Sequence, residues 1–389
     1  MVAFSKDVFD TICRDKTCDS LVHPWTKGCF KAALMIYASS IVGSAKFYSL
    51  VYLAQILMRG KKMAKKEEWI KMGRFYVRST LLGLLVSAVG LQLICLIRKL
   101  IGKFTYHSCV LIPYTLSGIF IYLEPPARRG LVINLFCNLL IEYFLRSLQR
   151  AGYLSITKSK QTLMFMVGSS LLFYLMRLEG DKEVKTPLFW FFSPEKVRKK
   201  SDESPNVCPH NGECKKHILK GASAYFGIGL GISLAKLILP QIRTPLKAIS
   251  TIRGKHLTLA LFFSSYIGIY RAIICYLCRK KGFDSAFYAL PAGYVAGLSF
   301  LFNPNLGLSI ASVTAALKLY ATILYEKKIL PSSIPLPEIM YCLCQGVLFS
   351  ARVMDPDVCP RYVFNLMDSV SNKRSLHVTK SLYETLKVT

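Results

Sequence analysis

The sequence contains one pattern of residues twice, at a separation of about 180 residues. Each copy begins with a group of cysteine and histidine residues, which a long apolar stretch follows. Further along, Cys95 precedes Arg98 in the first copy, and Cys275 precedes Arg279 in the second. Other matched residues are Pro113 with Pro291, Gly118 with Gly297, and Glu124–Pro125 with Asn303–Pro304. Repeats of this length that contain membrane-length apolar segments are typical of duplicated membrane domains.

The composition excludes an ordinary soluble domain. Hydrophobic residues make up 52% of the 389 residues, and the mean hydropathy is +0.37. The net charge of +29 is concentrated between the apolar segments, for example at Arg59–Lys62, Arg198–Lys200 and Arg279–Lys281. Such clusters attract anionic lipid head groups by about 1 kcal/mol per basic residue. We therefore expect a bilayer with anionic lipids as a partner, and no nucleic acid, because no soluble segment is long enough for a reader domain.

Apolar segments of membrane-spanning length predict the fold class. A helix of about 20 residues crosses a ~30 Å hydrocarbon core, and the alternation that a β-barrel needs is absent. We therefore expect an all-α, polytopic membrane bundle built from two sequence repeats of four to five transmembrane helices each. The expected segments are 31–57, 79–97, 108–123, 131–148 and 162–178, then 218–239, 256–277, 286–302, 307–325 and 338–352. The fifth segment of each repeat is the weakest, so eight or ten crossings, and parallel or inverted repeats, remain open.

Four regions follow from this pattern. They are a first membrane repeat with a cysteine-rich head (1–178), a polar charged linker (179–207), a second membrane repeat (208–352) and a C-terminal tail (353–389). The tail is polar, with a short amphipathic helix expected near its end. It either docks on the bundle or presents a site for a partner.

The cysteine and histidine residues at the head of each repeat are candidate ligands. Sulfur and nitrogen ligands suit zinc, but the spacing is not that of a zinc finger, so we expect no cofactor. A weak metal candidate is the set Cys208, His210, Cys214 and His217, whose first-repeat counterpart is Cys13, Cys18, His23 and Cys29. A metal site, disulfides within each head (Cys18–Cys29 and Cys208–Cys214) and reduced thiols at an interfacial turn all remain open. Trp25 is expected at head-group depth.

Six ionisable residues fall inside apolar segments: Lys46, Glu142, Arg146, Lys236, Arg271 and Lys318. A charge at the bilayer centre costs about 2.5 kcal/mol or more, so we expect these side chains to face the bundle or water. Glu142 and Lys318 occupy matched places in the fourth segments. We expect them to pair across the repeat interface, beside a polar path. Lys46 and Lys236 are expected instead to extend their ammonium groups toward an interface.

Two pairs of glycines four residues apart are candidate packing sites, Gly227 with Gly231 and Gly293 with Gly297. Such pairs lie on one face of a helix and allow two backbones to approach closely in lipid. The sequence contains no nucleophile–base–acid set, phosphate loop or metalloprotease motif. We therefore expect no catalytic residues and no enzyme activity.

Several of these motifs resemble a known family. The stretch Gly282–Gly293 with its continuation to Gly297, the head Cys18–Cys29 and the linker segment Cys208–Cys214 resemble the transmembrane protein 135 family, and the likeness covers essentially the whole chain. A more distant resemblance is to the Tim17/Tim22/Tim23/peroxisomal membrane protein superfamily. It rests on the motif residues Lys280, Asp284, Pro291, Gly293 and Gly297. The first repeat keeps Gly118 but has Phe104 near the place of the aspartate.

The resemblance implies a multi-pass protein of the mitochondrial or peroxisomal membrane. It also implies a role in mitochondrial dynamics, fission in particular, and in peroxisome-linked fatty-acid and lipid homeostasis. The residues themselves leave two mechanisms open, a conduit and a scaffold, and the superfamily resemblance implies a third, a translocase-like channel. The protein is a conduit for a lipid, fatty acid or solute between the two repeats, a membrane scaffold that recruits organelle-fission or lipid-metabolism proteins, or a channel like a protein translocase.

Overall fold

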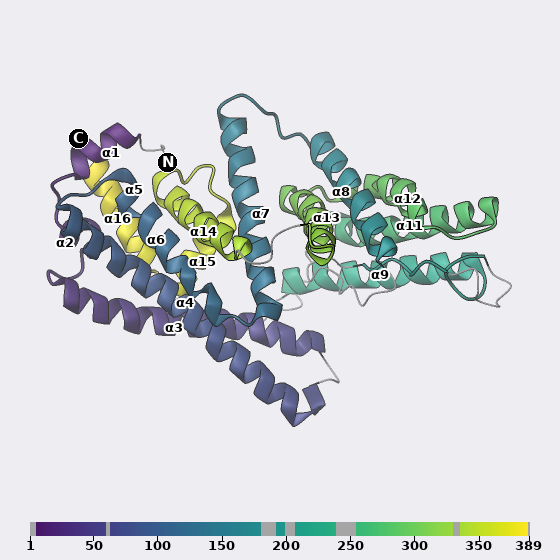
Figure 1. The fold of residues 1–389 in the computed structure, drawn as a ribbon, viewed down its shortest axis with the longest axis horizontal. Helices are drawn as coiled ribbons and strands as arrows, with labels where there is room; N and C mark the ends of the chain where they lie inside the picture. Colours follow the sequence, from purple (N-terminus) through teal and green to yellow (C-terminus); the bar gives the residue numbers. More distant parts are fainter. Residues whose placement is uncertain are drawn as a thin grey trace. The chain divides into compact units, whose positions relative to one another are not determined.

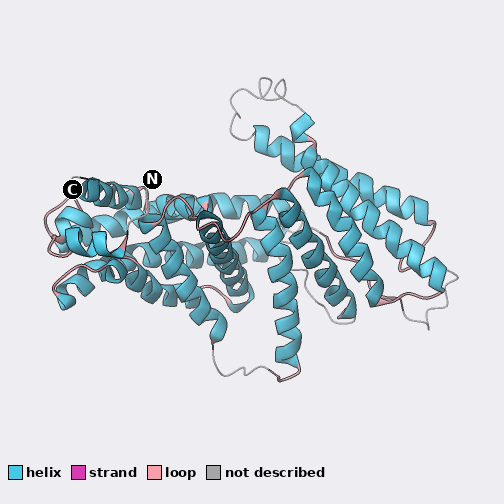
Figure 2. Ribbon diagram, turned by 90° about the horizontal axis from the view of Figure 1, so that it is seen from above, coloured by secondary structure: helices cyan, strands magenta, loops and turns pink. Residues whose placement is uncertain are grey.

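The computed structural model describes residues 5–59, 63–179, 192–198, 207–238, 254–329 and 335–387. In these residues the regular elements are helices and no strand occurs, as Figures 1 and 2 show. The expected all-α class is therefore confirmed. The chain divides into two compact units, each with its own hydrophobic core. Unit 1 contains Met1–Leu154 and Ile334–Thr389, and unit 2 contains Ser155–Ser333.

Eight helical segments among the described residues are long and apolar enough to cross a membrane. They are Cys29–Leu53, Lys66–Ile101, Tyr106–Leu123, Arg128–Arg150, Lys158–Leu178, Cys214–Ala235, Thr258–Lys281 and Leu306–Glu326. They correspond to eight of the ten expected segments. The expected segment 286–302 is a shorter apolar stretch, and 338–352 lies in a helix outside these eight.

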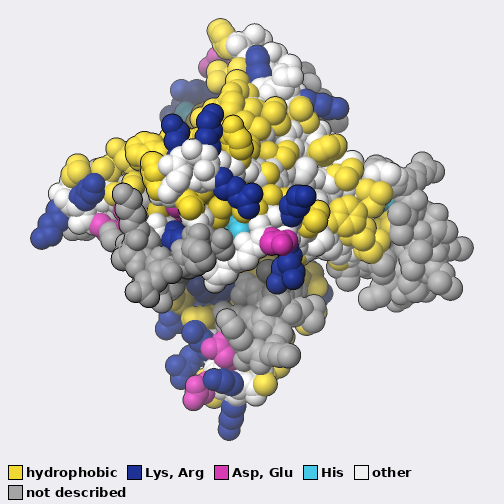
Figure 3. All heavy atoms as spheres, turned by 90° about the vertical axis from the view of Figure 1, so that its right-hand side faces the viewer, with side chains coloured by type: hydrophobic (Ala, Val, Ile, Leu, Met, Phe, Trp, Pro, Cys, Tyr) yellow, Lys and Arg dark blue, Asp and Glu magenta, His cyan; other side chains and the backbone are white. Residues whose placement is uncertain are grey.

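The outward faces of these segments are apolar. In the most apolar window of Cys29–Leu53 only 22% of the residues are buried, and in those of Arg128–Arg150 and Cys214–Ala235 only 17%. Leu50 and Leu219, for example, are 71% and 68% exposed. Figure 3 shows such exposed hydrophobic side chains on one face, together with Lys and Arg. A soluble monomer rarely exposes so much apolar surface, and a lipid environment satisfies it. The chain is therefore a multi-pass membrane-type helical protein.

Unit 1 is built on a hairpin of two long helices, α3 and α4, which pack along each other. A short broken segment (α5, α6 and η2) packs on α4, and helix α7 follows it. One further helix, α14, comes from the far end of the chain and packs on α6, η2 and α7 (Figure 1). The bounds are α3 Cys29–Arg59, α4 Lys66–Ile101, α5 Tyr106–Cys109, α6 Leu111–Ser117, η2 Gly118–Leu123, α7 Pro126–Arg150 and α14 Leu336–Met354.

Unit 2 contains elements of the same kinds in the same contacts. Its long hairpin is α9 with α11, its short broken segment is η5, α12 and η6, and α13 follows. Helix α8 packs on α12, η6 and α13. The bounds are α8 Lys158–Leu178, α9 Cys214–Ile238, η4 Gly254–His256, α11 Thr258–Lys281, η5 Ala286–Tyr288, α12 Ala289–Ala296, η6 Gly297–Phe302 and α13 Leu306–Glu326.

The short third segments break at equivalent places. α6 contains Pro113 and α12 contains Pro291, and each helix tightens into a 3-10 turn at a glycine, Gly118 or Gly297. A proline removes a backbone donor and a 3-10 turn shifts the side-chain spacing, so neither segment continues as one regular α-helix. This explains why these segments are the shortest of their units.

The units do not follow the sequence boundaries that we expected. Helix α8, the expected fifth segment of the first repeat, packs in unit 2, and α14, the expected fifth segment of the second repeat, packs in unit 1. The division between units falls after Leu154 and again near Ile334, rather than between 178 and 208. Most of the expected linker 179–207 lies outside the described residues.

Small residues allow α8 and α14 to pack closely against their neighbours. On α8, Gly168 lies so close to α13 that an added Cβ would be 2.7 Å from the backbone nitrogen of Val313. Gly293 and Gly297 of the short segment bring their backbones equally close to α8. In unit 1, Gly118 approaches α14 at Cys342 in the same way. Close backbone contact of this kind is the main source of packing energy between helices in lipid.

The other expected glycine pair does not make such a contact. A Cβ at Gly227 or Gly231 would meet no atom of the described residues within 4 Å. Gly229, which lies between them on the opposite face of α9, is the residue that approaches α11, at Ala260. Gly227 and Gly231 therefore do not make the predicted contact among the described residues, because glycines at every second position, 227, 229 and 231, left the packing face of the helix ambiguous.

The C-terminal tail docks on unit 1. Helices α15 (Arg361–Val370) and α16 (Arg374–Lys387) pack on α3 and on the N-terminal helices α1 (Lys6–Cys13) and α2 (Cys18–Leu21). Gly43 of α3 permits this approach, since a side chain there would collide with the carbonyl oxygens of Ser369 and Val370. Of the two alternatives for the tail, the structure shows docking.

The glycine contact on α8 gives a direct test of this packing. We expect Gly168→Leu to lower the free energy of unfolding by about 1–3 kcal/mol, because the added side chain has no room against α13. The matched control is Gly227→Leu, which we expect to leave stability unchanged or slightly raised, since that position is open and a helical glycine is itself unfavourable. Thermal unfolding of the detergent-purified chain measures both. Equal destabilisation by the two variants would contradict this packing.

Candidate functional site

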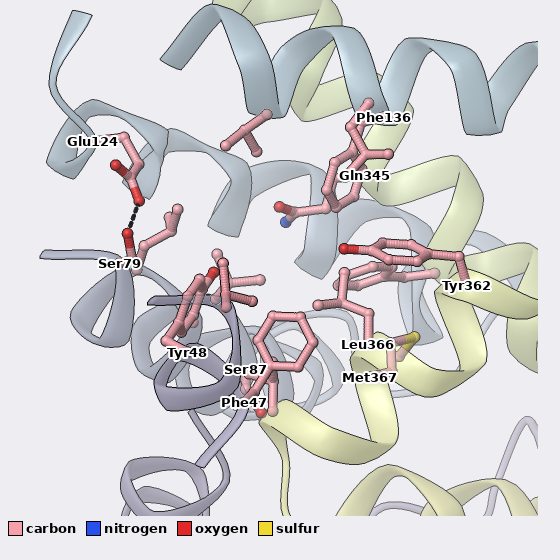
Figure 4. A pocket seen from close by; sticks show the side chains of 18 of the residues that line it. Phe47, Tyr48, Ser79, Ser87, Glu124, Phe136, Gln345, Tyr362, Leu366 and Met367 are labelled. Atoms are coloured by element: carbon pink, nitrogen blue, oxygen red, sulfur yellow. Dashed lines mark hydrogen bonds between the residues drawn. The ribbon is translucent and has the colours of Figure 1, made fainter. Parts of the chain in front are cut away.

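A cavity of about 160 Å³ lies inside unit 1 (Figure 4). Helices α3, α4, α7, α14 and α15 enclose it, so residues from both ends of the chain line it. Most of its wall is apolar, with Phe47, Phe136, Leu366 and Met367 among the side chains around it. Tyr362 also lines it, and burial raises the pKa of this phenol, which keeps it neutral.

Polar groups gather at one end of the cavity. The Glu124 carboxylate is 3% exposed and accepts a hydrogen bond from the Ser79 hydroxyl, as Figure 4 shows. The Tyr52 hydroxyl lies 2.9 Å from the Ser79 Oγ. Arg128 donates to the Tyr52 hydroxyl, and its guanidinium lies over the rings of Tyr52 and Phe75 at 4.8 and 5.0 Å. Ser79, Glu124 and Arg128 line the cavity, so a hydroxyl, a carboxylate and a cation lie together in a mostly apolar wall.

Two buried acceptors at the cavity have no hydrogen-bond partner among the described residues. One is Oε2 of Glu124, and the other is Oε1 of Gln345. The amide nitrogen of Gln345 is satisfied, because it donates to the Tyr114 carbonyl at 2.7 Å and to the Ser117 hydroxyl at 3.1 Å. Leaving a buried acceptor without a donor costs about 1–3 kcal/mol. The cavity is therefore suited to a guest that brings a hydrogen-bond donor.

Local backbone chemistry positions Glu124. The 3-10 segment η2 ends at Leu123, and Glu124 takes an extended conformation. Pro125 and Pro126 follow, and Pro126 is the first residue of α7, where a missing N–H costs nothing. Sequence analysis did not identify Glu124 as a site residue. The available signal was the match between Glu124–Pro125 and Asn303–Pro304, which marks the same turn in both halves.

The six ionisable candidates lie elsewhere, and none whose side chain is described lines this cavity. Glu142 pairs with Arg146 one turn later on α7, at 2.6 Å. Arg271 binds Glu195 at 2.9 Å and the His217 carbonyl at 3.0 Å. The others are Lys46, which is exposed on α3, Lys318, which lies on α13, and Lys236, whose side chain lies outside the described residues. The expected Glu142–Lys318 pair remains a prediction.

Asp284, from the distant superfamily motif, is a structural partner of α8. Both of its carboxylate oxygens accept hydrogen bonds from the Arg177 guanidinium, at 2.6 and 2.7 Å. Both side chains are buried, with exposures of 0% and 1%. The backbone nitrogen of Arg198 and the Cys278 thiol also donate to Asp284. Of the other motif residues, Lys280 is exposed beside the Tyr276 ring, Pro291 is exposed on α12, and Gly293 and Gly297 contact α8.

The N-terminal head forms a cluster of four soft ligands, which we call cluster 1: Cys18, His23, Cys29 and Cys95. One potential ligand atom from each residue lies within 4.8 Å of all the others. A hydrogen bond with Cys95 and the positive charge of Arg98 lower the pKa of the Cys18 thiol. Cys13, which we expected in this set, is instead buried in the hydrophobic core. Trp25 lies beside the cluster, under the Arg374 guanidinium at 4.7 Å.

Unit 2 contains the corresponding cluster 2: Cys208, His210, Cys214 and Cys275, all buried. The two sulfur atoms of Cys208 and Cys214 are 3.7 Å apart. Burial and the adjacent Cys214 thiol raise the pKa of Cys208, whereas burial and the nearby His217 lower that of His210. His217, an expected member, lies outside the cluster: its ring stacks on His210 and its Nε2 is 3.3 Å from Glu195. The expected fourth ligand was wrong because Cys275 comes from α11.

Residues 15–148 match the family model of the N-terminal cysteine-rich region of Transmembrane protein 135. This match supports the transmembrane protein 135 family for the chain. The matched region includes cluster 1 and the parts of α3, α4 and α7 that line the cavity. It does not reach α14 or α15, which complete the cavity wall. No solved structure matches the chain.

The Arg177–Asp284 pair gives a second test. We expect Arg177→Ala to lower the free energy of unfolding by about 3–5 kcal/mol, because it leaves the Asp284 carboxylate buried without its cation. Thermal unfolding of the purified protein measures the loss. We expect the double variant Arg177→Ala/Asp284→Ala to recover part of it, since no uncompensated charge then remains. A double variant as unstable as the sum of the two single variants would contradict a direct pair.

Proposed function

We propose that unit 1 binds a fatty acid, or a closely related single-chain lipid, in its cavity. The observation that carries this proposal is a mostly apolar space in which a cation and a carboxylate, Arg128 and Glu124, lie in one part of the wall. The apolar wall suits methylene groups, which gain about 0.8 kcal/mol each on burial. The polar end suits a carboxyl group, because Arg128 offers a cation and Oε2 of Glu124 offers an acceptor to an acid proton.

The size of the cavity limits how much of a lipid it holds. A cavity of about 150 Å³ in another protein accommodates one benzene molecule. The cavity of unit 1 is of the same order, so it takes the carboxyl end and the first part of an acyl chain. The rest of the chain then lies outside the cavity, where the exposed apolar faces of the helices and the bilayer accept it.

Lipid binding in this position agrees with what the family resemblance implies. We propose that the protein acts in a mitochondrial or peroxisomal membrane and contributes to fatty-acid and lipid homeostasis. Its association with mitochondrial fission would then follow from a change in lipid content of that membrane. If the protein is a conduit, the bound lipid must leave the cavity by a different route from the one by which it entered. If the protein is a scaffold, the lipid need not leave.

We also infer that the two units are copies of one ancestral helical block. Each unit has a long hairpin with a cysteine and histidine head, a short segment broken at proline and glycine, and a following helix. Helices α8 and α14 are at matched places in the sequence, and each completes the unit formed by the other half. In the proposed duplication, the fifth helix of each sequence repeat therefore packs with the first four segments of the other repeat.

Photo-labelling tests the lipid proposal. A long-chain fatty acid that carries a diazirine is added to the purified protein in lipid nanodiscs, and labelled peptides are identified by mass spectrometry. We expect labels on α4, α7 and α14 around the cavity. Leu135→Trp fills the cavity and should reduce labelling there about tenfold or more, which corresponds to about 1.4 kcal/mol or more of binding energy.

Two controls sharpen this test. Leu53→Trp adds the same side chain on the exposed face of α3 and should leave labelling unchanged. Arg128→Gln should weaken binding of the fatty acid but not of the corresponding fatty alcohol, which has no carboxyl group for the cation. Equal labelling of the wild-type and Leu135→Trp proteins would contradict binding in the cavity and favour the scaffold.

A further inference from the structure

We propose that each unit binds one zinc ion through three cysteines and one histidine. The first site is cluster 1 (Cys18, His23, Cys29 and Cys95), and the second is cluster 2 (Cys208, His210, Cys214 and Cys275). Thiolate and imidazole ligands in this ratio are a standard set for structural zinc. This inference does not depend on the lipid proposal, because neither cluster lines the cavity.

The spacing of the sulfur atoms fits a metal better than a disulfide. Zinc–sulfur bonds of about 2.3 Å at tetrahedral angles place two sulfurs about 3.8 Å apart. The Cys208 and Cys214 sulfurs are 3.7 Å apart, whereas a disulfide requires about 2.05 Å. Within each cluster, the four potential ligand atoms also lie within 4.8 Å of one another. Every cysteine in both clusters is free.

The His23 ring is oriented as a zinc ligand is. The Nδ1 atom of His23 lies 2.8 Å from the Thr26 carbonyl, which accepts its proton and fixes the tautomer. This leaves the Nε2 lone pair directed away from that bond, and Nε2 is buried with no hydrogen-bond partner in the part of the chain that the structure describes. A metal-bound histidine usually donates its other ring N–H to a carbonyl or carboxylate oxygen. In cluster 2, Nε2 of His210 points to the Cys275 sulfur at 3.2 Å.

Both clusters occupy the same place in their units. Two ligands precede the first long helix, a third is the first residue of that helix (Cys29 or Cys214), and the fourth is on the helix that packs along it. An arginine lies near each cluster, Arg98 by Cys18 and Arg279 by Cys208, and it offsets the negative charge of a zinc ion with three thiolates. The same four-ligand arrangement is therefore present in both units.

The donor set selects the metal. No carboxylate belongs to either cluster, so calcium and magnesium, which prefer oxygen, do not fit. Iron–sulfur clusters usually take four cysteines, and each site here has three. A zinc ion at either site would join the head of a unit to the ends of its long hairpin, α3 with α4 or α9 with α11. Its role is therefore to hold that hairpin closed.

Metal analysis of the full-length chain tests the proposal. The protein is expressed in zinc-supplemented medium, purified in detergent under reducing conditions, and analysed by mass spectrometry for elemental zinc. We expect about two zinc ions per chain. Cys95→Ser and Cys275→Ser should each reduce this to about one, and the double variant should bind almost none.

Matched cysteine variants serve as controls. Cys137→Ser in unit 1 and Cys278→Ser in unit 2 lie outside the clusters and should keep two zinc ions. Cobalt substitution gives a second readout that does not depend on the variants. The wild-type protein should then show the visible absorption of tetrahedral cobalt bound to thiolates. Wild-type protein without zinc, with iron in its place, or with a Cys208–Cys214 disulfide would overturn the proposal.

Discussion

A buried arginine holds each of the two helices that complete the units. Arg177, near the end of α8, binds both oxygens of Asp284, and Arg352, near the end of α14, binds Asp368 and the Thr379 hydroxyl. Both arginine side chains are only 1% exposed. Burying a guanidinium without a hydrogen-bonding carboxylate costs several kcal/mol. Each helix is therefore stable in the position where its arginine reaches its acidic partner. The remaining contacts of α8 and α14, including those at small residues, follow from that position.

Such anchoring explains what the sequence could and could not predict about the fold. Apolar segments of membrane length predicted nearly every long helix, because hydrophobicity along the chain is a local property. They could not predict which unit α8 or α14 joins, since both helices are apolar and hydropathy does not specify a partner. The deciding residues are Arg177 and Arg352. Their partners, Asp284 and Asp368, are visible as partners only in three dimensions.

The candidate sites divide in the same way. The local parts of clusters 1 and 2 were evident from the sequence, because Cys18 to Cys29 and Cys208 to Cys214 lie close together in the chain. The sequence showed Cys95 and Cys275 as matched residues but not as ligands. Each is separated from the other three cluster residues by a long helix along the chain. The cavity was not predicted at all. Its wall combines helices from both ends of the chain, and its key acid, Glu124, is placed by a turn rather than by an apolar pattern.

Oxidative cross-linking in native membranes tests most directly whether α14 packs in unit 1. The sulfur atoms of Cys137 on α7 and Cys344 on α14 are 3.9 Å apart. Brief oxidation with copper phenanthroline, followed by peptide mapping, should therefore yield a Cys137–Cys344 disulfide that is absent from a Cys137→Ser variant. A product that joins Cys344 to Cys278 of unit 2 instead, with no Cys137 product, would contradict the account.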